Sequence, residues 1–199
     1  MKSEERFWNR VATKTDLSET GTLIIKKSLS HLKPKDELLD FGCGDGTLTH
    51  KIADHVSHID ALDFSSRMIE IARSTSHHKK IDFHYGNIEK LNLTRQSFDA
   101  ILAFNVLHFV NHKRALKERF HELLKPGGYF ISYTPCIGDH QSWQRIVLTL
   151  TQYVGLTPKM EFFNTENLQN HQLLNGLEII ESTPIKGADM FIVAQKPNN

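Results

Sequence analysis

Short apolar runs alternate with amphipathic segments along the central part of the chain. The apolar runs have the length of strands and lie at residues 37–41, 58–62, 81–84, 98–104 and 129–133. The amphipathic segments carry apolar residues at helical spacing and lie at residues 47–55, 66–73 and 112–124. Strands that alternate with helices predict an α/β fold with a mostly parallel sheet.

The two ends of the chain depart from this alternation. Helical spacing predicts two helices at 5–11 and 21–32. Two strand-like runs at 177–182 and 190–195 flank the short segment 184–187, which predicts a hairpin. The predicted fold is a doubly wound, Rossmann-like sheet of seven strands, mostly parallel, with an antiparallel last strand and helices on both faces.

The segment between residues 135 and 176 also lies outside the alternation. Apolar residues from Trp143 to Val154 have helical spacing, and Gly155 is a typical helix stop. We expect a single domain with four parts. These are a helical leader or lid (1–33), a ligand-binding core (37–134), a helical insertion that caps a pocket (135–176) and a hairpin (177–196). Residues 196–199 are expected to fray.

Composition narrows the classes of function. The 199 residues are 39% hydrophobic, and 24 Lys and Arg against 23 Asp and Glu leave a formal net charge of +1. This balance does not favour binding to nucleic acids or anionic membranes. No apolar run approaches the about 18 residues of a spanning helix, the first residues lack the pattern of a signal peptide, and two distant cysteines form no disulfide framework. We therefore expect a cytoplasmic protein with no membrane partner.

A glycine-rich turn, Gly42–Cys43–Gly44–Asp45–Gly46, joins the first strand of the core to its helix. Doubly wound sheets bind ligands here, because glycine backbone comes close to a ligand and the next helix offers unpaired N–H groups. The dinucleotide pattern needs glycine where Thr47 stands, which disfavours a nicotinamide cofactor. Asp63 ends the next strand at about the distance where an acid accepts from ribose hydroxyls, so an adenosine ligand is predicted.

These residues resemble the motifs of the class I S-adenosylmethionine-dependent methyltransferases over nearly the whole chain. Five segments carry the resemblance. They are the first motif (Leu38–Thr47), the end of the second strand (Asp63–Met68), the third-strand motif (Gly86–Ile88), the fourth strand (Phe98–His108) and the turn before the fifth strand (Leu123–Gly128). Phe7–Ala12 is similar to openings of the small-molecule branch of this family.

The resemblance implies S-adenosyl-L-methionine as the cofactor and a small molecule as the methyl acceptor. It implies cofactor contacts from Asp40, Gly42, Cys43, Gly44, Gly46, Asp63, Phe64, Met68, Asn87, Ile88, Phe104 and Asn105. Phe64 and Ile88 would meet the adenine faces, and Phe104 or Asn105 the methionine end. The family usually has aspartate where Asn87 stands. The amide oxygen of Asn87 can still accept from the adenine amino group, without the assistance of a charge.

Methyl transfer from an activated sulfonium needs mainly an acceptor held in line at about 3 Å. A base can help to deprotonate the acceptor, and His108, at the carboxyl end of the fourth strand, is the first candidate. His140 is the second. Histidine pairs such as His55 and His58 lack a complete ligand set in the sequence, so no metal site is expected.

Three other functions stay open. A module that binds the cofactor without turnover, or a partner subunit, would carry the same motifs. An RNA or protein methyltransferase is less expected, because no Asn-Pro-Pro-aromatic motif follows the fourth strand and Cys136 lacks the partner cysteine element of cytosine-carbon methylases. The glycine spacing disfavours the third, a nicotinamide oxidoreductase. An apolar or aromatic acceptor is favoured by the aromatic residues available to a pocket, Phe7, Trp8, Trp143, Tyr153, Phe162 and Phe163.

Overall fold

The computed structural model describes residues 2–110, 113–136, 138, 149–153, 156–169 and 176–198. Its strands are β1 (Glu37–Phe41), β2 (His58–Asp63), β3 (Ile81–Tyr85), β4 (Phe98–Phe104), β5 (Leu124–Thr134), β6 (Glu178–Lys186) and β7 (Asp189–Gln195). Its helices are α1 (Lys2–Val11), α2 (Glu19–Leu29), α3 (Thr47–Ala53), α4 (Ser66–Thr75), α5 (Lys113–Leu123) and α7 (Thr165–Gln169), with the 3-10 helices η1 (Ile88–Lys90) and η2 (Leu107–Phe109).

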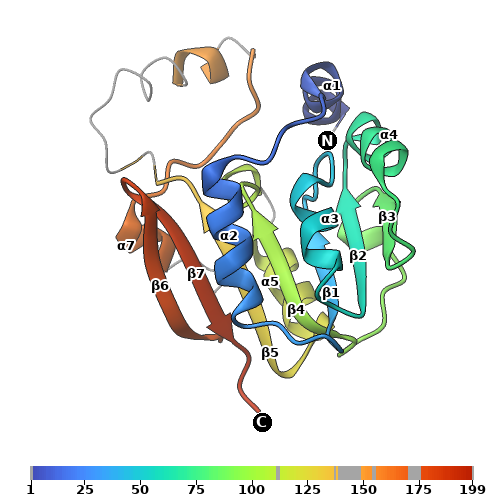
Figure 1. The fold of residues 1–199 in the computed structure, drawn as a ribbon. Helices are drawn as coiled ribbons and strands as arrows, with labels where there is room; N and C mark the ends of the chain where they lie inside the picture. The colour runs from blue at the N-terminus through green and yellow to red at the C-terminus, as the bar shows by residue number, and fades with distance from the viewer. Residues whose placement is uncertain are drawn as a thin grey trace.

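A seven-stranded sheet runs through the molecule in the order β3-β2-β1-β4-β5-β7-β6 (Figure 1). Strands β1 to β5 pair in parallel, and β7 pairs antiparallel with both β5 and β6. The chain reverses its direction of winding at β1, which lies between β2 and β4. The predicted doubly wound sheet with an antiparallel last strand is confirmed.

Helices cover both faces of the sheet, because successive side chains of a strand point to opposite faces. One face packs α2, α3 and α4 into a core that includes Leu38. The other face packs α5 and α7 into a core that includes Leu39. Both leucines are fully buried, as the central strand of a parallel sheet requires. Helix α1 lies over the carboxyl ends of the central strands, next to α4 (Figure 1).

The C-terminal hairpin differs from the prediction. The sequence predicts its turn at 184–187, whereas β6 continues through Lys186 and the turn is at residues 187–188. Pro184 stays inside β6 because β6 is the edge strand, where a missing N–H removes no ladder bond. The register with β7 shifts between Pro184 and Lys186.

Strand β5 also begins earlier than predicted. Phe98 pairs with Leu124 and Ala100 pairs with Tyr129. Residues 125–128 therefore form an irregularity within β5 opposite Asp99, where the sequence predicts a turn before the strand.

The prediction that the last residues fray is wrong at Lys196, which is buried. Its Nζ donates to the carbonyl oxygens of His121 at 2.6 Å and Leu124 at 2.8 Å. Its backbone N–H donates to Gly128 O at 2.9 Å. Lys196 therefore ties the end of β7 to the C-terminal end of α5.

Most of the predicted helix between Trp143 and Gly155 lies outside the described residues. The described part, 149–153, is helical. Its Leu150 is 59% exposed, so this part does not bury the apolar face that the spacing predicts. In the described part of the chain, no helix combines the length and the apolar character needed to cross a membrane.

Candidate active site

Two adjoining cavities, of about 330 and 240 Å³, lie at the carboxyl ends of the central strands. The first extends toward the leader and α3, and the second extends toward η1 and α5. They adjoin because the same residues line both, namely Trp8, Gly42, Asp63, Phe64, Val106 and Phe109. This is the place where open α/β sheets bind ligands.

The glycine turn after β1 brings bare backbone to the first cavity. Gly42 has a φ of +79°, and a Cβ there would lie 2.6 Å from Val106 Cγ2. Gly44 has a φ of +58°, and a Cβ there would meet nothing within 4 Å. Position 42 therefore requires glycine, because a side chain there would clash with Val106. At Gly44 the missing side chain leaves open space for a ligand beside the backbone.

Asp63 links the end of β2 to the glycine turn. Its Oδ2 accepts from Gly44 N–H at 3.0 Å, and its Oδ1 accepts from Ser65 N–H at 2.8 Å. Burial raises the pKa of the Asp63 carboxyl, and these backbone hydrogen bonds oppose the shift. Each oxygen of an ionised carboxylate has two lone pairs, so Asp63 can accept further hydrogen bonds from a ligand in either cavity.

Asp40 is a second buried carboxyl beside the first cavity. Thr49 Oγ1 donates to Asp40 Oδ2 at 2.6 Å. Burial, with the neighbouring Asp63 charge, raises the pKa of Asp40 to about 6 despite the Thr49 bond. Burial and the same carboxylates raise the pKa of the Cys43 thiol well above its usual range, so Cys43 is an uncharged wall residue and not a nucleophile.

The leader closes the first cavity through Asp45. Asp45 Oδ2 accepts from Thr15 N–H at 2.5 Å, Thr15 Oγ1 at 2.8 Å and Thr47 Oγ1 at 3.0 Å. Asp45 Oδ1 accepts from Thr47 N–H at 3.1 Å, in the first turn of α3. One carboxylate thus joins the segment before α2, whose residues 15–18 line the cavity, to the start of α3.

Helix α1 closes the cavities from another side. Asn9 Oδ1 accepts from Ser65 Oγ at 2.7 Å, which holds α1 on the N-terminal turn of α4. The rings of Trp8 and Phe109 meet edge to face with centroids 4.9 Å apart. Trp8 and Phe109 therefore form an aromatic bridge between the leader and the segment after β4.

The segment after β4 turns sharply beside the first cavity. Asn105 has a φ of +56°, a conformation that few residues other than glycine adopt. Its N–H donates to Tyr133 O at 2.9 Å, which holds the turn on β5. Asparagine is one of the few residues besides glycine that adopt this conformation readily, which suits it to the turn beside the cavity.

Charge along the cavities has one sign. The charged residues that line the first cavity are Asp16, Asp40, Asp45 and Asp63, and those of the second are Glu4, Asp63 and Glu89. None of the described residues that line either cavity is Lys, Arg or His. This lining suits a ligand with positive charge and is unfavourable to the pyrophosphate of a dinucleotide.

Comparisons with known proteins agree with this geometry. The pattern of a family described as methyltransferase domain matches residues 39–132. A malonyl-[acyl-carrier protein] O-methyltransferase of Priestia megaterium is 28% identical over 152 residues, which cover 73% of this chain and 55% of that protein. A ubiquinone biosynthesis O-methyltransferase of Coxiella burnetii is 30% identical over 158 residues, which cover 74% of this chain and 66% of that protein.

Solved structures share the fold. N-methyltransferase NodS from Bradyrhizobium japonicum, in complex with S-adenosyl-l-homocysteine, matches with a TM-score of 0.74 at 18% identity, over 99% of this chain and 100% of that one. The chain belongs to the class I S-adenosylmethionine-dependent methyltransferases. The family predicted from the sequence is thereby confirmed. The chain spans between about half and two thirds of the length of the curated relatives named above.

The residues that line the two cavities fit the family's cofactor, S-adenosylmethionine. The open backbone at Gly44 leaves room for the ligand. The Asp63 carboxylate keeps acceptor capacity for ribose hydroxyls. The acidic lining matches the positive charge of the sulfonium.

The structure brings almost all of the predicted cofactor residues together. Those that line the first cavity are Asp40, Gly42, Cys43, Gly44, Asp63, Phe64, Met68, Phe104 and Asn105. Asn87 and Ile88 line the second, together with Gly42, Asp63 and Phe64. Gly46, the N-cap residue of α3, lines neither cavity, and a Cβ there would lie 3.2 Å from Ala72 Cβ of α4.

The two candidate bases are placed differently. His108 lines neither cavity, and its ring lies against Phe109 with centroids 4.0 Å apart. Its Nδ1 is buried and has no hydrogen-bond partner among the described residues. Burial lowers the pKa of His108 to about 4. His140 lies outside the described residues.

The aromatic residues expected at an acceptor pocket lie in different parts of the structure. Trp8 lines both cavities. Tyr153 is 90% exposed, and Phe163 is buried in the core under α5. Trp143 lies outside the described residues. The sequence does not predict the wall formed by residues 15–18, since tertiary hydrogen bonds of Thr15 with Asp45 and Thr47 bring this segment to the cavity.

Proposed function

We propose that the protein transfers a methyl group from S-adenosylmethionine to a small-molecule acceptor. The observation that carries this proposal is the Asp63 carboxylate beside the Gly44 backbone in a cavity lined by acids. When bound, the cofactor supplies an activated methyl group for in-line displacement. The protein's part is to bind both reactants and to hold them in line.

Individual residues have distinct parts in this proposal. The backbone at Gly44 lies against the methionine and ribose portions, and Asp63 accepts from the ribose hydroxyls. Asn87 accepts from the adenine amino group in the second cavity, where Ile88 covers one face of the base. Ionised Asp40 stabilises the positive charge at the methionine end.

The acceptor side is assigned to the part of the first cavity beyond Asn105. Leu17, Ile24 and Tyr133 are among the residues that line the first cavity, and they give it an apolar wall. An apolar or aromatic acceptor fits this wall. The curated relatives named above carry O-methyltransferase names, which supports a small molecule with an oxygen nucleophile as the first class to screen.

We expect methyl transfer without a base from His108. With a pKa of about 4 its ring is neutral above about pH 5, and a group with so low a pKa is a weak base. His108→Gln should change kcat less than about threefold and leave the pH profile of kcat unaltered. A loss of 100-fold or more, with an altered profile, would make His108 the base.

Calorimetry tests the cofactor assignment. Titration with S-adenosylmethionine and S-adenosylhomocysteine should show saturable binding, and NAD should show none. Asp63→Asn should weaken binding at least tenfold. Asp36→Asn is the matched control, because Asp36 is also a buried carboxyl, bonded to Lys33 N–H at 2.8 Å, but lines neither cavity.

Three outcomes would contradict the proposal. The cofactor assignment fails if folded protein binds neither compound, or if Asp36→Asn and Asp63→Asn weaken binding equally. The catalytic assignment fails if bound S-adenosylmethionine is not converted to S-adenosylhomocysteine with any phenolic, carboxylic or amine acceptor.

A further inference from the structure

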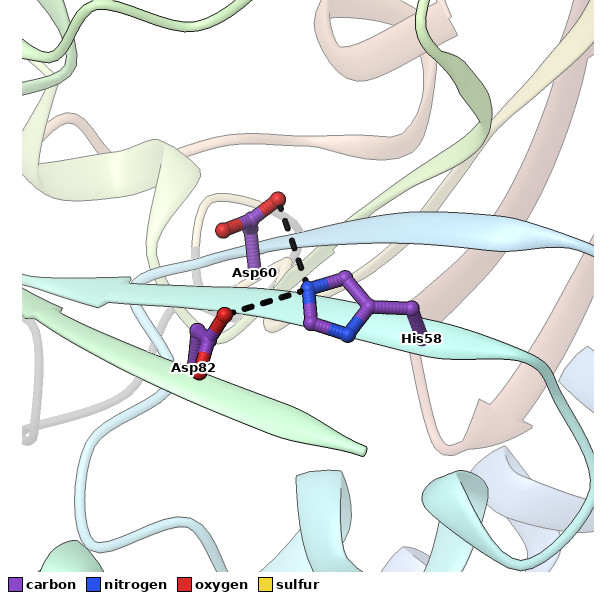
Figure 2. Close-up of side chains that lie close together, drawn as sticks. All are labelled: His58, Asp60 and Asp82. Carbon is purple, nitrogen blue, oxygen red and sulfur yellow. Dashed lines mark ion pairs between the residues drawn. The ribbon is translucent and has the colours of Figure 1, made fainter. Parts of the chain in front are cut away.

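A cluster of histidine and aspartate side chains lies on β2 and β3, away from the two cavities. Within the described part of the chain, His58, Asp60 and Asp82 form the group of potential metal ligands whose atoms lie close enough to share an ion, all within 4.8 Å of one another. Figure 2 shows the His58 ring pointing toward both carboxylates.

Strand geometry brings these residues together, although Asp82 is more than 20 residues away from the other two in the sequence. His58 and Asp60 are two residues apart on β2, so their side chains share one face. Asp82 pairs with Asp60, and His84 pairs with Leu62, in the parallel register of β2 and β3. Sequence spacing gave no reason to expect a metal, because the carboxylate of Asp82 joins His58 only through this register.

The distances suit ligands of a common ion better than direct hydrogen bonds. His58 Nε2 lies 3.6 Å from Asp82 Oδ2 and 3.8 Å from Asp60 Oδ2. Hydrogen bonds to carboxylates are about 2.7–2.9 Å long. Two ligands of a tetrahedral zinc ion, each bound at about 2.0–2.1 Å, are about 3.3 Å apart. Small movements of the side chains would therefore seat an ion between these atoms.

Asp60 is already held in place by a neighbour. His84 Nε2 lies 2.6 Å from Asp60 Oδ1, which leaves Oδ2 on the side of His58. Partners of this kind orient metal ligands and increase affinity. The side chains of His58 and Asp60 are 33% and 20% exposed and that of Asp82 is 69% exposed, so the cluster lies at the surface and is open to ions.

We propose that His58, Asp60 and Asp82 bind a divalent transition-metal ion of the zinc type. Imidazole nitrogen with carboxylate oxygen suits zinc and its neighbours, whereas magnesium and calcium prefer oxygen alone. His84 orients Asp60, and water completes the coordination. The ion would join β3, an edge strand, to β2. Its role is structural, because Asp60 is three residues, about 10 Å of strand, from Asp63.

The test uses the whole chain after treatment with a chelator. Zinc chloride is titrated by calorimetry, and the melting temperature (Tm) is measured with and without zinc. We expect one saturable site, and a rise in Tm of about 5–10 °C at a hundredfold excess over Kd. His58→Asn and Asp82→Asn should each weaken binding at least tenfold. Cobalt should give the visible absorption of a low-coordinate site in the unmutated chain and not in these two variants.

Asp54→Asn is the matched control. Asp54 is 61% exposed and lies 3.8 Å from His78 Nδ1, a histidine–carboxylate pair without a third ligand among the described residues. Zinc affinity should stay within twofold in this variant. The absence of a saturable site, or an equal loss in Asp54→Asn and Asp82→Asn, would overturn the proposal. Circular dichroism confirms that each variant is folded, and the readouts do not depend on methyl transfer.

Discussion

At the scale of single residues, Asp40 couples protonation to ligand binding. Its folded pKa of about 6 lies above the ordinary value of 3.8, so its contribution to stability is complete below about pH 3.8 and is lost as pH rises through about 6. A positively charged ligand favours the ionised form. The Kd for S-adenosylmethionine should therefore fall about tenfold from pH 5 to pH 7. Calorimetry at pH 5, 6 and 7 measures this dependence.

Asp40→Asn should remove most of that dependence, because the amide does not titrate. The Asp36→Asn variant, whose buried carboxyl lines neither cavity, should keep it. Equal pH slopes in wild type and Asp40→Asn would show that another group controls binding.

Two glycines of the turn should have different effects when replaced: Gly42 mainly on stability, and Gly44 mainly on cofactor binding. Gly42→Ala should destabilise the fold by about 2–4 kcal/mol, because it combines a positive φ with a Cβ 2.6 Å from Val106. Gly44→Ala should cost only about 1 kcal/mol, since open space surrounds its Cβ, yet weaken cofactor binding more than tenfold. Urea denaturation and calorimetry measure the two effects. Unchanged binding in Gly44→Ala would place the cofactor elsewhere.

At the scale of elements, the hydrogen bonds of Asp45 hold the leader against α3. Asp45→Ala removes both bonds to Thr15, so hydrogen exchange over residues 13–18 should accelerate at least tenfold and cofactor dissociation should become faster. Asp16→Asn is the control, because it removes a charge from the same cavity and leaves those bonds intact. Equal exchange rates in both variants would show that charge, and not the hydrogen bonds, closes the cavity.

Helix α5 is stabilised at its C-terminal end by Lys196, a residue far away in the chain. Its ammonium group donates to the carbonyl oxygens of His121 and Leu124, which lie where the helix dipole is negative. Lys196→Met should lower the free energy of unfolding by about 2–3 kcal/mol. Lys186→Met, on the exposed edge, should change it by less than about 0.5 kcal/mol. Similar values for the two variants in urea denaturation would contradict this role.

At the scale of the whole molecule, the sequence predicts what depends on local pattern. The alternation of apolar runs and helical segments is sufficient to predict the sheet and the helices on its two faces. The turn at Gly42–Gly46 and the acid at Asp63 are sufficient to predict where the centre of the candidate site lies. By contrast, the sequence does not predict the contact between Thr15 and Asp45, because the two residues are 30 positions apart and no pattern identifies them as partners. The position of Pro184 in β6 depends on that strand being an edge, which only the complete sheet reveals.

The place of β7 has a consequence for biosynthesis. Residues 189–195 fill the gap between β5 and β6, and every residue of β5 from Tyr129 to Thr134 pairs with them. While the ribosome is still adding these residues, β5 is an open edge whose Phe130 and Ile131 alternate toward two unfinished cores. The nascent chain is therefore exposed to strand-to-strand association until β7 emerges, and the sheet is completed only after the residues that line the two cavities have been translated.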